Sequence, residues 1–197
     1  MSLKISPTVE ETYKRFYYRF KEIISKKPNK VLKIGLSGGS FPELFTPHLL
    51  KSGIDFSKIH FFFVDERFVQ KSSEFSTFKA YENFFSTIPA ENIHHIDLDC
   101  SIEESAVRYQ EHILEFFMNQ TCIPIFDLMI LGLGPDGHTA SLFPDHPANE
   151  VLEKLAIPIV DSPKPPRERI TMTLPLISNA EHVIFVATGE SKNEPLK

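Results

Sequence analysis

The chain has 197 residues and a mass of 22.5 kDa, and its 42% hydrophobic content is enough for the core of one domain. A net charge of −5 argues against a protein that binds nucleic acid or an anionic membrane through its overall charge. The two cysteines lack metal or redox spacing, neither end resembles a signal peptide, and no apolar run approaches the ~20 residues of a spanning helix, so we expect a cytoplasmic protein.

The first two predicted helices flank a buried strand. Ser6-Pro7 is typical of a helix start, and an apolar stripe follows to Ile24. Val31 to Leu36 predicts the strand, which ends in the turn Ser37-Gly38-Gly39-Ser40 before a helix beginning at Pro42. A glycine turn with hydroxyls at a helix N-terminus can cradle an anion, although a plain tight turn fits this segment equally well.

A second strand is predicted over Ile59 to Val64, and the charged triplet Asp65-Glu66-Arg67 follows it. Such a triplet usually marks a return to solvent. Here it follows a strand that we expect to lie beside another strand whose end carries functional groups. A helix is predicted over 75–85, and a short strand over 92–96.

Histidines and carboxylates gather around that short strand and raise the question of a metal site. They are His94, His95, Asp97 and Asp99, and their spacing matches no zinc motif, so no metal is expected. Ser101 and Glu104 then form a capping box for a helix that reaches Phe117.

The segment from Phe126 to Pro144 carries the strongest signal for chemistry. Leu128 to Leu131 is a short apolar run that suits a strand buried on both faces, and a glycine-rich turn follows it. This turn presents Asp136 and His138 just before Thr139, where we predict a new helix. A histidine at a helix N-terminus favours the neutral ring, which can act as a general base that Asp136 orients. The alternative is that His138 only caps the helix.

Two motif matches in these turns have other interpretations. Residues 132–137 fit the dinucleotide pattern G-x-G-x-x-G, but the turn holds a carboxylate and follows a late strand, which argues against a dinucleotide. Residues 35–39 fit the G-x-S-x-G nucleophile elbow, and Ser37, Asp65 and His138 occur in hydrolase order, so a serine esterase stays open.

The remaining chain adds a short helix over 149–155, a proline-rich loop over 161–169 and strands over 170–173 and 182–187. Either Arg167 or Arg169 could reach an anionic ligand from the loop, and Lys192 follows the last strand. The alternation predicts an α/β fold: a doubly wound, mostly parallel Rossmann-like sheet with helices on both faces. The polar turns would then meet at the carboxyl ends of the strands and form one site.

With these motifs in order, the sequence resembles the glucosamine-6-phosphate isomerase/6-phosphogluconolactonase family, and specifically its lactonases. The resemblance runs from about Val31 to Lys192 and depends most on residues 132–144. It implies a sugar-phosphate isomerase/CoA-transferase-like fold and hydrolysis of 6-phospho-D-glucono-1,5-lactone in the oxidative pentose phosphate pathway, without metal or coenzyme. The substrate, a small sugar-phosphate lactone, is the expected partner.

The resemblance also implies roles for individual residues. His138 would be the general base that activates water, with Asp136 assisting it. Arg67 and Asp65 would line the reacting end of the site. The substrate phosphate would be held by Ser37, Gly38, Gly39, Ser40, Arg169 and Lys192. Since water attacks directly in this family, Ser37 would not be a nucleophile.

Several features leave alternatives to the lactonase. Phe41 and Thr77 stand where the family often has threonine and asparagine. We expect a single lactonase-like domain over 1–197 that lacks a C-terminal strand and helix, with possible fusion to or association with other enzymes of the pathway. The alternatives are a catalytically impaired sugar-phosphate binding module and a glucosamine-6-phosphate deaminase-like enzyme. The deaminases typically carry a glutamate where Ser141-Leu142-Phe143-Pro144 stands here, which favours the lactonase.

Overall fold

A five-stranded parallel sheet organises the chain in the computed structural model, which describes residues 2–118 and 122–196. Its spatial order is β4-β2-β1-β5-β8, and each adjacent pair of strands is parallel. The strands are β1 (Leu32–Leu36), β2 (Ile59–Phe63), β4 (Ile93–His94), β5 (Leu128–Leu131) and β8 (Val183–Phe185). Met1 and Lys197, the ends of the predicted domain, lie outside the described residues.

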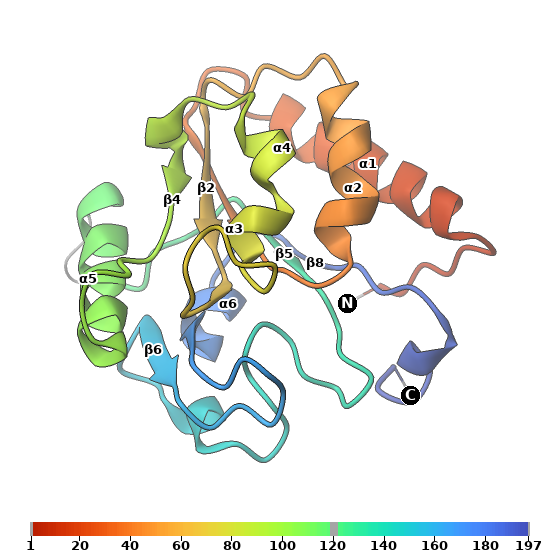
Figure 1. Cartoon of the computed structure of the whole chain (residues 1–197). Coiled ribbons are helices and arrows are strands. Elements are labelled where there is room, and N and C mark those ends of the chain that lie inside the picture. Colours follow the sequence, from red (N-terminus) through yellow and green to blue (C-terminus); the bar gives the residue numbers. More distant parts are fainter. Residues whose placement is uncertain (1, 119–121, 197) are drawn as a thin grey trace.

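The two faces of this sheet support two separate hydrophobic clusters, because successive side chains of a strand point to opposite faces. Ile34, Phe61 and Ile130 belong to the cluster covered by α1 (Val9–Ser25), α2 (Phe41–Leu50) and α4 (Glu82–Phe85). Phe62 and Met129 belong to the other, which is covered by α5 (Ile102–Phe116) and α6 (Leu174–Ser178). Figure 1 shows these two groups of helices on opposite sides of the strands. The predicted doubly wound α/β fold is confirmed.

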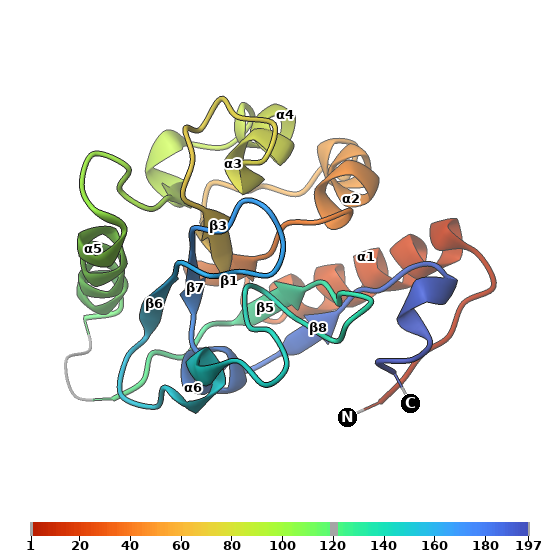
Figure 2. The ribbon, with the colours of Figure 1, turned by 60° about the horizontal axis from the view of Figure 1, so that its bottom comes forward.

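A second sheet of three antiparallel strands was not predicted. It has the order β3-β7-β6 and consists of β3 (Asp65–Arg67), β7 (Arg169–Met172) and β6 (Ala156–Ile159) (Figure 2). The charged triplet was predicted as the end of a strand, but it is a strand itself and pairs with β7 so that Arg67 faces Arg169 across the ladder. Only long-range pairing makes this segment a strand, since its own composition indicates a turn.

Several predicted helices are shorter than expected. The helix predicted over 75–85 is divided into α3 (Thr77–Ala80) and α4, and the helix predicted over 149–155 is a 3-10 turn, η2 (Pro147–Glu150). Two further 3-10 turns are η1 (Ala90–Asn92) and η3 (Glu190–Lys192). Half of the predicted capping box is present: the Ser101 hydroxyl accepts a hydrogen bond from the Glu104 backbone N–H, whereas the Glu104 carboxylate pairs with Arg108.

The helix predicted to begin at Thr139 is wrong. Residues 139–142 form a tight turn in which Thr139 and Leu142 exchange backbone hydrogen bonds, and Ala140 has a φ of 51°. Ser141 is held instead by Asp65, to which its hydroxyl donates at 2.9 Å. This tertiary contact takes the place of a helical turn, so no helix dipole acts on His138 here.

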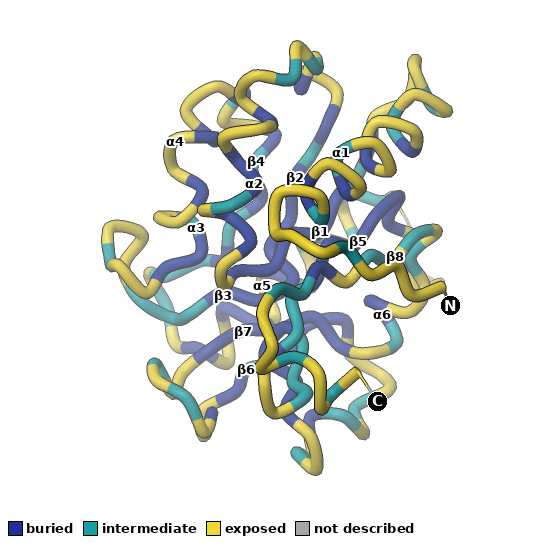
Figure 3. Tube along the Cα trace, turned by 90° about the vertical axis from the view of Figure 1, so that its right-hand side faces the viewer, coloured by how far each residue is buried: buried dark blue, intermediate teal, exposed yellow. Residues whose placement is uncertain are grey.

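The buried segments, which include most of β1, β2 and β5, lie towards the centre of the molecule, and the exposed segments surround them (Figure 3). β8 differs from the other strands of this sheet, because Val183 and Phe185 are exposed at its edge. Within residues 2–118 and 122–196, the helices are all too short or too polar to cross a membrane.

Candidate active site

A pocket of about 180 Å³ opens where the order of the parallel sheet reverses direction. From β1 the chain winds outward to β2 and β4 on one side, whereas β5 and β8 lie on the other. In such sheets the loops that follow the two central strands separate, and ligands bind between them. The pocket is lined by Ser37, Gly38, Gly39, Ser40, Phe41, Asp65, Arg67, Gly132, Leu133, Gly134, Pro135, His138, Ala140, Arg169, Val186, Ala187, Thr188 and Lys192.

His138 enters this pocket from the glycine-rich turn after β5, and two neighbours fix its ring. Its Nδ1 lies 2.6 Å from Asp136 Oδ1, and its ring stacks on Phe143 with the centroids 4.8 Å apart. A carboxylate can only accept, and Asp136 lies closer to Nδ1 than the Lys164 ammonium does at 3.2 Å, so we assign the proton to Nδ1, and Nε2 keeps its lone pair when the ring is neutral. The geometry therefore leaves one ring nitrogen able to accept a proton.

Gly134 allows His138 and Asp136 to pack closely against the backbone of this turn. A Cβ at this position would lie 2.0 Å from His138 Nδ1 and 2.5 Å from Asp136 Oδ1, far inside van der Waals contact. The glycine is thus required by the packing of the histidine and carboxylate against the turn, and not by a left-handed φ.

Asp136 is held as an anion by two donors. Partial burial alone would raise the pKa of this carboxyl, but hydrogen bonds from Lys164 and His138 outweigh burial and lower its pKa below the usual range. Lys164 Nζ lies 2.9 Å from the same Oδ1 that faces His138. Asp136 contacts His138 from outside the pocket lining.

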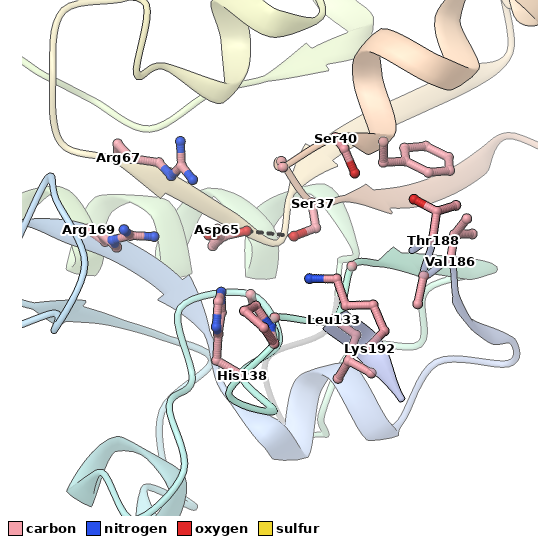
Figure 4. A pocket seen from close by; sticks show the side chains of 18 residues that line it. Ser37, Ser40, Asp65, Arg67, Leu133, His138, Arg169, Val186, Thr188 and Lys192 are labelled. Atoms are coloured by element: carbon pink, nitrogen blue, oxygen red, sulfur yellow. Dashed lines mark hydrogen bonds between the residues drawn. The ribbon is translucent and has the colours of Figure 1, made fainter. Parts of the chain in front are cut away.

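Asp65 is buried at the base of the pocket and is shared by two serines. Ser37 donates to Oδ1 at 2.8 Å (Figure 4), and Ser141 donates to Oδ2 at 2.9 Å. In a serine-hydrolase triad the histidine stands between serine and carboxylate. Here Ser37 contacts Asp65 directly while His138 contacts Asp136, so the arrangement argues against the serine esterase.

Two arginines form one end of the pocket. Arg67 and Arg169 lie opposite each other on β3 and β7, and Figure 4 shows both guanidinium groups on the same side of Asp65. Burial, followed by repulsion from Arg67, lowers the pKa of Arg169. Arg169 also donates to the carbonyl oxygens of Pro166 and Lys164, at 3.0 Å each, so it holds the proline-rich loop.

The other end of the pocket carries hydroxyls and Lys192. Ser40 precedes α2, whose first turn has free N–H groups, and Figure 4 shows Thr188 and Lys192 on the same side of the pocket as Ser40. Phe41, which stands where the family often has threonine, is buried against Phe16 and Phe45 and also lines the pocket. Arg167 is exposed and does not line the pocket, so Arg169 is the loop arginine that reaches it.

The structure brings the predicted site residues together. Nine of the ten line the pocket, and the tenth, Asp136, contacts one of the nine, His138. Sequence reasoning missed Lys164, Ser141 and Phe143. Lys164 lies in the proline-rich loop with Arg169, but no spacing in the sequence connects it with His138. Within the described ranges, no three His, Cys, Asp or Glu side chains converge in a way that could hold a metal ion.

This geometry defines a Rossmann-like α/β protein with a small pocket, lined in part by charged and hydroxyl side chains, at the switch point of its sheet. The family described as glucosamine-6-phosphate isomerases/6-phosphogluconolactonase matches residues 7–197. The chain is 38% identical over 196 residues to a probable 6-phosphogluconolactonase of Schizosaccharomyces pombe, covering 91% of this chain and 75% of that protein. It is 41% identical over 172 residues to the 6-phosphogluconolactonase of Homo sapiens, covering 83% of this chain and 66% of that protein.

Solved structures agree with these relatives. A 6-phosphogluconolactonase from Trypanosoma cruzi superposes with a TM-score of 0.88 at 29% identity, covering 98% of this chain and 83% of that chain. One from Thermotoga maritima gives a TM-score of 0.84 at 28% identity, covering 99% and 86%. The chain belongs to the glucosamine-6-phosphate isomerase/6-phosphogluconolactonase family, and the predicted family is confirmed.

Proposed function

We propose that this chain is a lactone hydrolase that converts 6-phospho-D-glucono-1,5-lactone to 6-phospho-D-gluconate in the oxidative pentose phosphate pathway. The observation that carries the proposal is His138, whose Nδ1 is held by Asp136 in a pocket with cationic side chains at both ends. The names of the relatives support this reaction, and the pocket suits a small, anionic substrate.

The reaction follows from the free lone pair on His138. Nε2 takes a proton from water while the water oxygen forms a bond to the lactone carbonyl carbon. The resulting tetrahedral oxyanion is stabilised by Arg67 at the reacting end, with Asp65 placing the neighbouring hydroxyls. When the intermediate collapses, the bond to the ring oxygen breaks and the imidazolium returns its proton to that oxygen. No metal or coenzyme takes part in this scheme.

The phosphate would occupy the opposite end. The turn from Ser37 to Ser40 offers hydroxyls and backbone N–H groups, and Lys192 adds a positive charge. Arg169 was predicted as a phosphate ligand, but it lies beside Arg67. Its guanidinium also packs over the Phe143 ring on which His138 stacks. Its contact with the phosphate therefore requires a substrate pose that spans the pocket, and it stays a prediction.

We infer a single lactonase-like domain over 1–197 and a cytoplasmic location. Fusion to or association with other enzymes of the pathway stays a prediction. The chain spans about two thirds to three quarters of the relatives named above, so their full-length activity is proposed for it here.

The test is hydrolysis of freshly generated 6-phosphogluconolactone, coupled to oxidation of the product and corrected for the spontaneous rate. We expect acceleration by wild type and a loss of about 10²–10⁴-fold in kcat for His138→Gln, because general-base catalysis is removed. His182→Gln, at a histidine outside the pocket, is the matched control and should keep wild-type turnover. Near-normal turnover by His138→Gln would contradict the assignment of the base.

Wild type without any acceleration would point to the binding module instead. In that case 6-phosphogluconate should still bind saturably, as measured by calorimetry. Deamination of glucosamine 6-phosphate by wild type would select the deaminase-like alternative.

A further inference from the structure

Lys164 is a cation at the candidate active site that the predicted roles leave out. It belongs to the proline-rich loop before β7, and its ammonium lies 2.9 Å from Asp136 Oδ1 and 3.2 Å from His138 Nδ1. The same Oδ1 atom lies 2.6 Å from His138 Nδ1. One carboxylate oxygen thus faces both a lysine and the predicted general base.

The backbone of Lys164 is fixed from beneath by buried side chains. Its carbonyl oxygen accepts hydrogen bonds from Arg169 Nη2 at 3.0 Å and from the Ser162 hydroxyl at 2.8 Å. Its N–H donates to the same hydroxyl at 3.2 Å. Ser162 is fully buried and Arg169 is 3% exposed. Their hydrogen bonds therefore fix the backbone of Lys164 at a position from which its ammonium reaches Asp136.

The charges around His138 affect how readily its ring is protonated. A lone carboxylate beside an imidazole orients the ring but also favours its protonated form. A second cation on the same oxygen offsets that charge, while the carboxylate still accepts from Nδ1–H. The pair Lys164–Asp136 therefore separates the two effects of Asp136 and keeps only the orienting one.

We propose that Lys164 is a positioning residue, whose ammonium neutralises Asp136 so that this carboxylate fixes the tautomer of His138 without favouring its protonation. The inference deepens the proposed lactonase function, on which its kinetic consequence rests. The charged side chains that line the pocket beside His138 are Asp65, Arg67, Arg169 and Lys192, and the variants below leave all four in place.

The direct test is a ¹⁵N-histidine NMR titration of the ligand-free protein, with His138 assigned from the spectrum of His138→Gln. Wild type should show Nδ1 protonated and Nε2 free in the neutral ring. In Lys164→Met the titration midpoint of His138 should move up by about one pH unit, the size expected for one charge at hydrogen-bonding distance. Lys164→Arg should restore the wild-type midpoint, and Lys154→Met, at an exposed lysine outside the pocket, should not change it.

The same variants give a kinetic readout. For Lys164→Met, the acidic limb of the pH profile of kcat/KM should shift upward with the NMR midpoint, whereas Lys164→Arg should follow wild type. A His138 midpoint unchanged in Lys164→Met, or a wild-type ring protonated at Nε2, would overturn the inference. The NMR titration needs no turnover. An inactive wild type would therefore refute the proposed function, and the titration would still test this inference.

Discussion

In the turn after β5, Gly134 lies against both members of the His138–Asp136 pair and leaves no room for a side chain. The nearest atom to a Cβ added at this glycine would be Nδ1 of the histidine, so any side chain must displace the ring that the turn is built to hold. The glycine pattern at residues 132–137 matches a nucleotide motif in sequence alone. In the structure its role is to admit a histidine and a carboxylate to the same space.

Gly134→Ala should therefore lower activity more than stability. We expect kcat/KM to fall at least about 10-fold, since a displacement of about 1 Å at a catalytic group is costly. Gly53→Ala is the contrasting control, because Gly53 has a φ of 66° and no atom within 4 Å of the added Cβ. It should lose about 1 kcal/mol of stability and no turnover per folded molecule. Equal turnover in Gly134→Ala and wild type would show that the turn tolerates the shift.

At the scale of elements, Glu66 connects β3 with the N-terminus of α3. This fully buried carboxylate accepts from the N–H groups of Thr77 at 2.7 Å and Phe78 at 2.8 Å, and from His95 Nε2 at 3.2 Å. Burial alone would raise the pKa of Glu66, but hydrogen bonds from His95 and these N–H groups lower it. The middle residue of the charged triplet is thus structural, and it fixes the strand that carries Asp65 and Arg67.

A chain of three histidines joins β2, β4 and α5. His60 Nδ1 lies 2.8 Å from His94 Nε2, and His94 Nδ1 lies 2.6 Å from His112 Nε2. Burial, with repulsion from His112 and His60, lowers the pKa of His94 to about 3. Burial also lowers the pKa values of His60 and His112. Because all three pKa values lie below the ordinary value of about 6.5, these histidines are mainly neutral at pH 7 in the folded protein.

This chain predicts loss of stability in mild acid. The folded pKa of His94 lies below the unfolded value of about 6.5, so its contribution is complete above that pH and falls as the pH drops towards 3. We expect the free energy of unfolding in urea to fall by about 2 kcal/mol between pH 7 and pH 5 for this one group. His94→Gln should flatten that dependence, although it lowers stability at pH 7. Glu66 does not contribute in this window, because a carboxyl with a lowered pKa loses its contribution only below about pH 4.3. An equally steep dependence in His94→Gln would assign the loss to other groups.

At the scale of the whole molecule, segments distant in the sequence meet in one pocket. The turns after β1 and β5, the strand β3, the proline-rich loop and η3 each supply lining or supporting groups. Because the two sheets and both hydrophobic clusters must form before these groups meet, binding of a ligand is linked to folding of the entire chain.

The product 6-phosphogluconate should accordingly stabilise the folded state. At about 100 times its dissociation constant it should add about 2.7 kcal/mol to the free energy of unfolding, measured in urea with and without ligand. Lys192→Met should weaken this effect and raise KM about 10-fold or more, the size of one charge-assisted hydrogen bond, with little change in kcat. Gluconate, which lacks the phosphate, should stabilise much less, and Lys154→Met should respond like wild type. Equal stabilisation of wild type and Lys192→Met would remove Lys192 from the phosphate site.

The sequence by itself determined the local elements and the candidate residues. Mainly apolar runs predicted β1, β2 and β5. The residue types at the following turns predicted much of the pocket lining, because the carboxyl ends of parallel strands lie at one edge of the sheet. Tertiary structure alone decided three features: β3 as a strand, the turn in place of a helix after His138, and Lys164 beside Asp136. Each depends on partners far apart in the sequence, such as Asp65 with Ser141 and Arg67 with Arg169, and no periodicity within a local window encodes such a contact.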